Sequence, residues 1–527
     1  MQVIIPMTGD GSLFIRAGYS VPKPLIPVDG RPMITHVTGM FPDSTDFLFL
    51  CSRNDLVTGP LEGMLRHASP ASRIVAIEAG SANSIQMILE GGKFIQDSEP
   101  AMVVRGDFAS GSFGRFLRSI AQFPCDSAIT ARRGLCSPAP GTATYLRYRN
   151  GRLLEARAGQ PFSSNSAQES SASGAYYFRS GAMLKHYLRK ATLMDSTATG
   201  EHGVAAACNL MVRDGLSVSV HELDCIASWR TPEELEEYSR WSDYFAKWAD
   251  WSPAKPASAG ATLIPIAGAG THDAYPKPLA PVAGVAMIER VLSTLPASSQ
   301  TMAICRTEHI RNTLLSRVMR LARPGIRALS LAQAAEGHVC LCLMPDAALD
   351  SRSPVLIAPG DASLIYDEYA LAALSATADC VVFTSPVDSQ RARQARTRWV
   401  TTREDDTVDR VFVNEMPPDI AAPRALAGMF WFREAGVMFD AVRHWVDSGR
   451  RTTEPFDLSL VLQHLTESGY SVRAFDVTHR ISFASPYDVQ AWEYWEAYFR
   501  GSASHPYANH PTPIPIAAAL PLHAAVA

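Results

Sequence analysis

The residues best suited to chemistry lie near the N-terminus and form a pattern that could hold phosphate. Residues 3–6 (VIIP) are an apolar, β-branched run typical of a buried parallel strand, and Gly9, Gly11 and Ser12 follow almost at once. Glycines there let backbone N–H groups approach an anion and form a nest for phosphate. Lys23 comes next, between two prolines that restrict its backbone. The pattern predicts a phosphate-binding loop with one rigidly held cation.

A carboxylate follows 84 residues after Lys23 (107−23), at the end of another predicted strand. Residues 101–108 (AMVVRGDF) are apolar up to Val104 and then reach Asp107. Ligands of open α/β sheets lie outside the carboxyl ends of the strands, so Asp107 could reach a bound ion. An aspartate at a strand end is also a common helix cap, and this position alone does not separate the two roles.

Other elements of the same region must position these residues. Residues 46–51 (DFLFLC) read as a second buried strand, and residues 78–89 begin with small residues and become a helix. Residues 142–156 read as two strands joined by Asn150-Gly151, a hairpin turn signal. These elements predict an α/β fold with a mostly parallel sheet flanked by helices.

Composition excludes several classes of protein. The chain has 527 residues, 47% hydrophobic and 19% charged, as expected for a soluble protein with more than one domain. The net charge of -4 gives no basic surface for nucleic acid. No apolar run is long enough for a membrane span, no signal peptide is predicted, and nine scattered cysteines fit reduced thiols in the cytoplasm.

The landmarks of the first half recur in the second half at one constant offset. Four pairs are each separated by 254 residues (277−23, 361−107, 428−174 and 485−231): Lys23 and Lys277, Asp107 and Asp361, Gly174 and Gly428, Thr231 and Ser485. A constant interval through four motifs predicts a tandem duplication. We therefore expect domains at residues 1–250 and 259–500, a linker at 251–258 and a disordered tail at 501–527.

The opening stretch resembles a known family. Gly9-x-Gly11-Ser12, then residues 22–25 (PKPL) and 31–34 (RPMI), is similar to the opening signature of sugar-phosphate nucleotidyltransferases. The Gly-Tyr before PKPL is similar to the branch common in capsule and surface-polysaccharide biosynthesis. The family's arginine after Gly-x-Gly-Ser is Leu13 here, and Arg16 lies three residues further on.

The resemblance implies a fold, a reaction and roles for individual residues. The fold would be two tandem Rossmann-like, GT-A-related domains. The enzyme would condense a nucleoside triphosphate with a sugar phosphate, yielding a nucleotide sugar and pyrophosphate. Lys23, Asp107 and Arg16 would be catalytic, with Mg²⁺ on Asp107. The nucleotide would contact the phosphate loop, and the loop containing Gly80 would face the base.

Two further positions depart from the family pattern. The lysine that holds the sugar phosphate is replaced by Ala158-Gly159, and a second metal-binding aspartate by Ser228. Losing one preorganised cationic contact typically costs about 10²–10³ in rate, so the losses bear directly on activity. The residues that could compensate are Arg16, Arg31 and Arg105.

The second copy departs further. Gly268 and Lys277 are nine residues apart (277−268), against fourteen in the first copy (23−9), and His272 stands where the family has arginine. Gly268, Gly270, Lys277 and Asp361 keep the counterpart positions, but Val285-Ala286 replaces Arg31-Pro32. We expect a second copy that is structural or regulatory, the alternative being a second active site of different specificity.

Two other functions remain open at this point. One is a non-catalytic protein that binds a nucleotide or sugar phosphate. The other is a glycosyltransferase, which usually carries Asp-x-Asp at the third strand end, where this chain has Gly106-Asp107-Phe108. The expected ligands are a nucleoside triphosphate and a sugar phosphate, with the base, the acceptor and any homo-oligomer left open.

Overall fold

The chain forms two compact units. The structure, a computed structural model, describes residues 1–7, 11–78, 84–134, 143–163, 169–194, 200–250, 260–266, 271–272, 275–331, 342–386, 398–413, 415, 417, 424–448, 458–511 and 516. Unit 1 contains Met1–Ala249 together with Tyr494–His510. Unit 2 contains Asp250–Glu493 and the described residues after His510.

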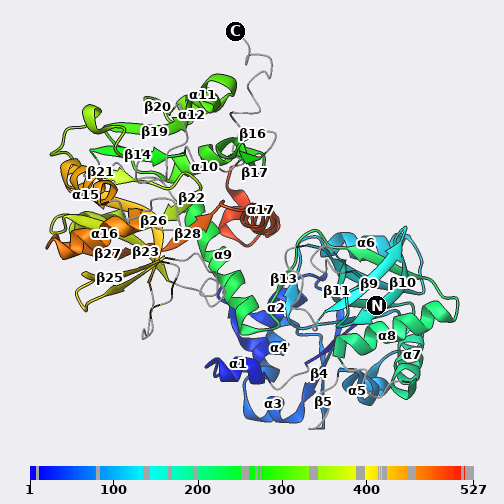
Figure 1. The fold of residues 1–527 in the computed structure, drawn as a ribbon. Helices are drawn as coiled ribbons and strands as arrows, with labels where there is room; N and C mark the ends of the chain where they lie inside the picture. Colours follow the sequence, from blue (N-terminus) through cyan, green and yellow to red (C-terminus); the bar gives the residue numbers. More distant parts are fainter. Residues whose placement is uncertain are drawn as a thin grey trace. The chain divides into compact units, whose positions relative to one another are not determined.

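Unit 1 is built on one sheet that runs through its centre (Figure 1). Its strands, in spatial order, are β5 (Arg73–Ile77), β4 (Asp46–Ser52), β1 (Gln2–Pro6), β6 (Ala101–Val104), β11 (Ser171–Phe178), β8 (Ser127–Arg132), β12 (Val218–Glu222), β10 (Arg152–Ala158) and β9 (Thr144–Arg149). The predicted strands at residues 3–6 and 46–51 become β1 and β4, whereas the strand predicted at 101–108 is shorter, because β6 ends at Val104. Because β1 lies between β4 and β6, the loops that leave these strands start at one edge of the sheet.

The sheet is mixed, which corrects the expectation of a mostly parallel one. Strands β5, β4, β1 and β6 pair in parallel, and so do β8 and β12. Strand β11 runs antiparallel to both β6 and β8. Strands β9 and β10 form the predicted hairpin, with left-handed backbone at Asn150 (φ 50°) and Gly151 (φ 71°). Buried apolar runs fixed the strands, but their directions depend on connections that local pattern does not reveal.

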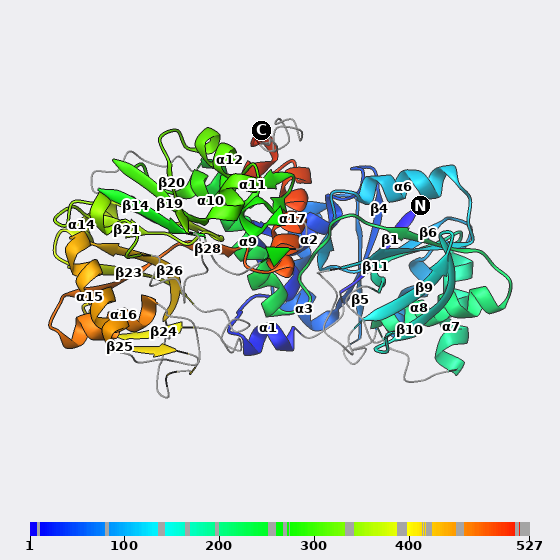
Figure 2. The ribbon, with the colours of Figure 1, turned by 45° about the horizontal axis from the view of Figure 1, so that its top comes forward.

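Helices cover both faces of this sheet (Figures 1 and 2). The helices of unit 1 are α1 (Ser12–Arg16), α2 (Met33–Thr38), α3 (Arg53–Thr58), α4 (Leu61–Ala68), α5 (Ser84–Glu90), α6 (Phe113–Gln122), α7 (Gly181–Met194), α8 (Gly200–Arg213) and α9 (Pro232–Asp250), with 3₁₀ turns η1 (Lys23–Leu25) and η2 (Gly91–Phe94). Alternate side chains of β1 lie on opposite faces of the sheet, because Ile4 packs in one buried cluster and Val3 and Ile5 pack in the other.

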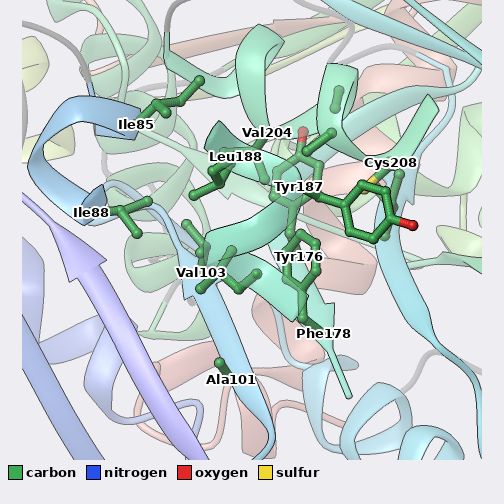
Figure 3. Close-up of a cluster of buried hydrophobic side chains, with 14 of the residues drawn as sticks. Ile85, Ile88, Ala101, Val103, Tyr176, Phe178, Tyr187, Leu188, Val204 and Cys208 are labelled. Carbon is green, nitrogen blue, oxygen red and sulfur yellow. The ribbon is translucent and has the colours of Figure 1, made fainter. Parts of the chain in front are cut away.

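One of these clusters joins three helices to the sheet. Figure 3 shows Ile85 and Ile88 of α5, Tyr187 and Leu188 of α7, and Val204 and Cys208 of α8 around Val103, Tyr176 and Phe178 of the sheet. The other cluster contains side chains of α2, α4 and α6. The two layers bury β1 and β6 completely and so fix the ends of these strands.

Unit 2 repeats this strand order. Its strands are β20 (Arg327–Leu331), β19 (Gln300–Arg306), β14 (Ala261–Pro265), β21 (Val355–Ile357), β26 (Arg424–Phe432), β23 (Cys380–Pro386) and β27 (Val472–Asp476), with β24 (Arg398–Thr402) and β25 (Val408–Val413) at one side. Position by position, the first seven correspond to β5, β4, β1, β6, β11, β8 and β12 of unit 1. The helices are α10 (Met287–Thr294), α11 (Thr307–Asn312), α12 (Leu315–Ala322), α14 (Glu368–Ser375), α15 (Ala435–Asp447), α16 (Leu458–Glu467) and α17 (Pro486–Gly501), with 3₁₀ turns η4 (Lys277–Leu279) and η5 (Asp346–Ala348).

Short elements recur at the same 254-residue interval. The turn η1 corresponds to η4 (277−23), and the ribbon β2 (Pro27–Val28) with β3 (Arg31–Pro32) corresponds to β17 (Pro281–Val282) with β18 (Val285–Ala286). Left-handed backbone recurs as well: φ is 46° at Asp29 and 47° at Ala283. A further ribbon in unit 1 pairs β7 (Phe108–Ala109) with β13 (Ala227–Ser228), and one in unit 2 pairs β22 (Ala362–Ile365) with β28 (His479–Ser482). Unit 2 also contains the ribbon of β15 (Thr271–His272) and β16 (Tyr275–Pro276).

The C-terminal segment Tyr494–His510 completes unit 1. Phe499 and Tyr507 are fully buried, and their rings lie 5.6 Å and 4.8 Å from the ring of Phe245 in α9. Tyr507 belongs to the turn η7 (Pro506–Asn509). Residues 501–511 are therefore ordered, which corrects the expected tail, because their aromatic side chains find an apolar surface far away in the sequence.

A buried polar network also holds this segment. Tyr238 and Ser242 of α9 each donate to the carboxylate of Asp29 at 2.5 Å. The ring nitrogen Nε2 of His505 lies 3.2 Å from the carbonyl oxygen of Ser242, and its Nδ1 accepts from the N–H of Tyr507. The network connects the turn between β2 and β3, which contains Asp29, with α9 and with the C-terminal segment.

Two expectations concern other parts of the chain. Residues 251–258, expected to be a linker, lie outside the described residues. Within the described part, every helix is either too short or too polar to cross a lipid bilayer.

Candidate functional site

The candidate site lies in unit 1, where Lys23 meets Asp107. Lys23 begins the turn η1, and Asp107 follows the end of β6. The Lys23 ammonium donates to Oδ2 of Asp107 at 2.6 Å and to the carbonyl oxygen of Arg230 at 3.2 Å. It also lies 5.4 Å from the centre of the Phe14 ring. Side chains and backbone from four segments thus hold one ammonium group at the edge of the sheet.

A second cation shares the same carboxylate. The Arg105 guanidinium donates to Oδ1 of Asp107, from Nη2 at 2.5 Å and from Nε at 2.8 Å. The side chains of Lys23, Arg105 and Asp107 are only 20%, 18% and 15% exposed. Burial opposes ionisation of Asp107, but Arg105 and Lys23 outweigh it and hold the pKa of this carboxyl well below its usual range. Asp107 is therefore ionised throughout the physiological pH range.

Gly174 makes room for Arg105. It has φ +113°, and a Cβ built there would lie 3.0 Å from Cδ of Arg105 and 3.3 Å from Cδ1 of Phe108. The carbonyl oxygen of Gly174 accepts from the backbone N–H of Arg105 at 2.9 Å. A larger residue at this position of β11 would press on the guanidinium stem, in a backbone conformation that only glycine adopts readily.

We expect Gly174→Ala to lower the free energy of unfolding by about 1–3 kcal/mol, since it adds both backbone strain and a close contact. The matched control is Gly63→Ala in α4, where nothing lies within 4 Å of the added Cβ. There alanine should be neutral or stabilising by up to about 1 kcal/mol, because glycine is a poor helix former. Urea denaturation of the full chain measures both. Equal effects of the two variants would contradict this role of Gly174.

A second ionic pair lies beside the first. Arg230 donates to Glu234 through Nη2 at 2.5 Å and through its backbone N–H at 3.0 Å. Ser228, which stands where the resemblance places a second metal-binding aspartate, donates to the same carboxylate at 2.8 Å. Burial opposes ionisation of Glu234, but Arg230 outweighs it, with help from the buried Arg132, and lowers the pKa of Glu234 to about 2.

Sequence reasoning missed this second pair. Glu234 lies in the first turn of α9, and its N–H donates to Thr231 Oγ1 at 3.3 Å. The ionic role of Glu234 depends on Arg230, which stands four residues earlier and just outside α9. Nothing in the spacing distinguishes such a pair from an ordinary helix cap.

The structure describes some of the residues that were expected to contact the nucleotide but not others. Gly11 is described, with φ 63°, and a Cβ added there would lie 3.9 Å from Cβ of Lys23. Ser12 begins α1, whereas Gly9 and Gly80 lie outside the described residues. The described part of the loop therefore packs beside Lys23.

The three arginines proposed to compensate behave differently. Arg16 is exposed and bonds back to Ser12 of its own helix, Nε to the carbonyl oxygen at 3.2 Å. Arg31 is exposed and donates to Ser504 at 3.0 Å. Among these three residues, Arg105 is the one whose guanidinium contacts Asp107.

The position where the resemblance places a lysine for the sugar phosphate has no charged side chain in this protein. At Ala158 strand β10 ends, and Gly159 turns with φ 69°. The preceding Arg157 pairs with Glu155 at 2.8 Å.

The donor set does not fit a resident magnesium ion. Mg²⁺ prefers oxygen ligands in octahedral geometry, and Asp107 is the one carboxylate that the resemblance leaves for it. Both oxygens of Asp107 already accept hydrogen bonds from cations. Ser228 stands in place of the second acid, and its hydroxyl group is itself a hydrogen-bond donor to Glu234. In the part of the chain that the structure describes, no three His, Cys, Asp or Glu side chains gather as a metal cluster would require.

Unit 2 keeps half of this arrangement. Lys277 donates to Oδ2 of Asp361 at 2.6 Å, as Lys23 does to Asp107. Pro359 occupies the position of Arg105 (359−254), so the second cation is absent from that strand end. Arg480 of β28 lies within electrostatic reach of Asp361, but its Nε donates to the carbonyl oxygen of Ala427 at 2.9 Å. Gly268 and Gly270 lie outside the described residues.

Comparison with known proteins finds likeness only in three-dimensional structure. No protein-family model matches the chain, and no curated protein matches its sequence. Solved structures similar to it include a nucleoside-diphosphate-sugar pyrophosphorylase from Vibrio cholerae, with 18% identity over 45% of this chain and 99% of that one and a TM-score of 0.37. A putative glucose-1-phosphate thymidylyltransferase from Bacillus anthracis has 17% identity over 45% and 94% of the two chains, with a TM-score of 0.37.

A third is the inositol-1-phosphate CTP transferase from T. maritima, with 14% identity over 46% of this chain and 98% of that one and a TM-score of 0.36. Each of these structures covers less than half of the present chain. The roles of individual residues therefore rest on the geometry described above.

Proposed function

We propose that unit 1 is a nucleotidyltransferase that joins a nucleoside triphosphate to a sugar phosphate and releases pyrophosphate. The observation that carries this proposal is the convergence of Lys23 and Arg105 on Asp107, at the strand end beside the loop that follows β1. Open α/β sheets bind their ligands at such an edge. A buried, net-positive group of side chains there suits a substrate with several phosphates.

The reaction depends on the positioning of the two substrates more than on covalent catalysis by the protein. An oxygen of the sugar phosphate would attack the α-phosphorus, a new P–O bond would form, and the bond to the β-phosphate oxygen would break as pyrophosphate leaves. Lys23 would offset negative charge on the phosphoryl oxygens, and the backbone of the loop at Gly11 and Ser12 would orient the phosphate chain. The proposal contains no magnesium held by the chain, since the donor set does not fit it.

We propose further that unit 2 arose by tandem duplication and serves as a non-catalytic partner. The shared strand order, the recurrence of η1 as η4 and the identical Lys–Asp distances support the duplication. The replacement of Arg105 by Pro359 supports the loss of function. The proposed product class is an activated nucleotide sugar, the form in which sugars enter surface-polysaccharide synthesis.

One observation favours a second candidate, a protein that binds the same ligands without reacting them. Asp107 is tied to two cations, and the family's loop arginine is Leu13, whose side chain is 49% exposed. This candidate shares the site and the ligand class, and differs only in turnover.

Pyrophosphate release separates these functions. The full chain is mixed with each of several nucleoside triphosphates and each of several sugar 1-phosphates, and pyrophosphate is measured with and without the sugar phosphate. We expect release with one combination, dependent on both substrates. Calorimetric binding without release would support the second candidate. Sugar transfer from a ready-made nucleotide sugar would instead identify a glycosyltransferase and contradict the proposal.

A further inference from the structure

We infer that Arg105 occupies the place at Asp107 where the resemblance puts a divalent metal, so that unit 1 binds its phosphate-bearing ligand without one. The inference rests on the proposed function for the ligand class, a phosphate ester or pyrophosphate. It adds that the positive charge is supplied by the chain itself. Binding should then persist when divalent ions are removed.

The first support is that both oxygens of the carboxylate already accept hydrogen bonds from cations. Lys23 donates to Oδ2 of Asp107 at 2.6 Å, and Arg105 donates to Oδ1 through two N–H groups at 2.5 Å and 2.8 Å. Hydrogen bonds between a charged donor and a charged acceptor are roughly twice as strong as those between neutral groups. A metal ion would have to displace one of these partly buried cations and then lie beside the other.

The second support is the charge balance around this carboxylate. Lys23 and Arg105 both contact the carboxylate of Asp107, so these three side chains carry two positive charges and one negative charge. A phosphate group is an anion, and opposite charges attract more strongly in a partly buried site, where the local dielectric is low.

The third support is that the structure builds Arg105 into place. Its backbone N–H bonds to Gly174, and its stem lies against the Cα of that glycine, where a Cβ would come within 3.0 Å. An arginine that only filled an exposed position would need no such close approach.

Unit 2 offers an internal comparison. Asp361 has a Lys277 partner at the same distance, but Pro359 cannot supply a guanidinium. The side chain of Asp361 is 37% exposed, whereas that of Asp107 is 15% exposed. The additional cation and the deeper burial of the aspartate therefore go together in unit 1.

Calorimetry with inorganic pyrophosphate, the proposed product, tests the inference. The full chain is titrated once in EDTA and once in excess Mg²⁺. We expect dissociation constants that agree within about threefold. In Arg105→Met, affinity in EDTA should fall at least about tenfold, as expected when a charged hydrogen-bond partner is lost. Part of it should return with Mg²⁺, because Oδ1 of Asp107 is then free for the metal.

Two further variants keep the test decisive. Arg105→Lys retains the charge but not the two N–H donors of the guanidinium that converge on Oδ1, and it should bind with an intermediate affinity in EDTA. Arg66→Met removes an exposed arginine that pairs with Glu62 in α4, and should bind like the parent. Thermal unfolding of each variant shows whether it is folded, and Arg105→Lys supplies the answer if Arg105→Met is not.

The outcomes separate this inference from the proposed function. Binding by the parent chain only when Mg²⁺ is present would overturn the inference and leave the function standing. Full affinity of Arg105→Met in EDTA would also overturn it. Failure of the parent chain to bind pyrophosphate under either condition would overturn both.

Discussion

Replacing Lys23 with alanine is expected to lower the rate of pyrophosphate release by at least about a hundredfold, since removal of one preorganised charge donor typically costs about 10²–10³. The resemblance implies three cationic contacts, namely a loop arginine, Lys23 and a sugar-phosphate lysine, and Lys23 alone keeps its position in this sequence. Its ammonium is held between Asp107 and the carbonyl oxygen of Arg230, and a water molecule in the space left by alanine would carry no positive charge. Initial rates at saturating substrate measure the effect.

Two lysines serve as comparisons. Lys247→Ala removes an exposed lysine of α9 that pairs with Asp243, and should leave the rate unchanged. Lys277→Ala removes the counterpart in unit 2, where the ion pair has the same 2.6 Å distance, and tests which unit performs the reaction. A rate lost with Lys277→Ala but kept with Lys23→Ala would assign turnover to unit 2 and contradict the proposal.

Replacing Phe499 with alanine is expected to lower the free energy of unfolding of unit 1 by about 3–5 kcal/mol, the usual cost of truncating a buried phenylalanine. Phe499 lies in α17, near the end of the chain, yet it is fully buried. Its ring lies 5.5 Å from Tyr238 and 5.6 Å from Phe245, both in α9, and 4.4 Å from His505. The cavity left behind would loosen the contact between the C-terminal segment and α9.

Hydrogen exchange locates this effect. Amides of β1 in unit 1 should exchange faster in Phe499→Ala, whereas those of β14 in unit 2 should change less, because the segment belongs to unit 1. Phe123→Ala is the control, since that side chain is 65% exposed and its loss should change stability by no more than about 0.5 kcal/mol. Faster exchange confined to β14 would show that the segment supports the other unit.

The sequence by itself predicted several local elements and proposed the repeat. Apolar runs predicted β1, β4 and β6, and Asn150-Gly151 predicted a hairpin, because burial of one strand and the backbone of one turn depend on a few neighbouring residues. The constant offset of 254 residues is a property of the sequence alone, and the strand order of the two sheets agrees with it. The rule that parallel strands present their carboxyl ends at one edge predicted that Asp107 lies at the ligand-binding edge of the sheet.

Only the tertiary structure decided the direction of β11, the partners of Asp107 and the place of the C-terminal segment. Arg105 reaches Asp107 because Gly174, almost seventy residues later (174−105 = 69), leaves room for its stem, and no local pattern records that fit. Phe499 is buried because α9 presents aromatic side chains to it from the other half of the chain. In both cases the deciding contacts join residues far apart in sequence, so their energy appears only once the sheet and the helices have come together.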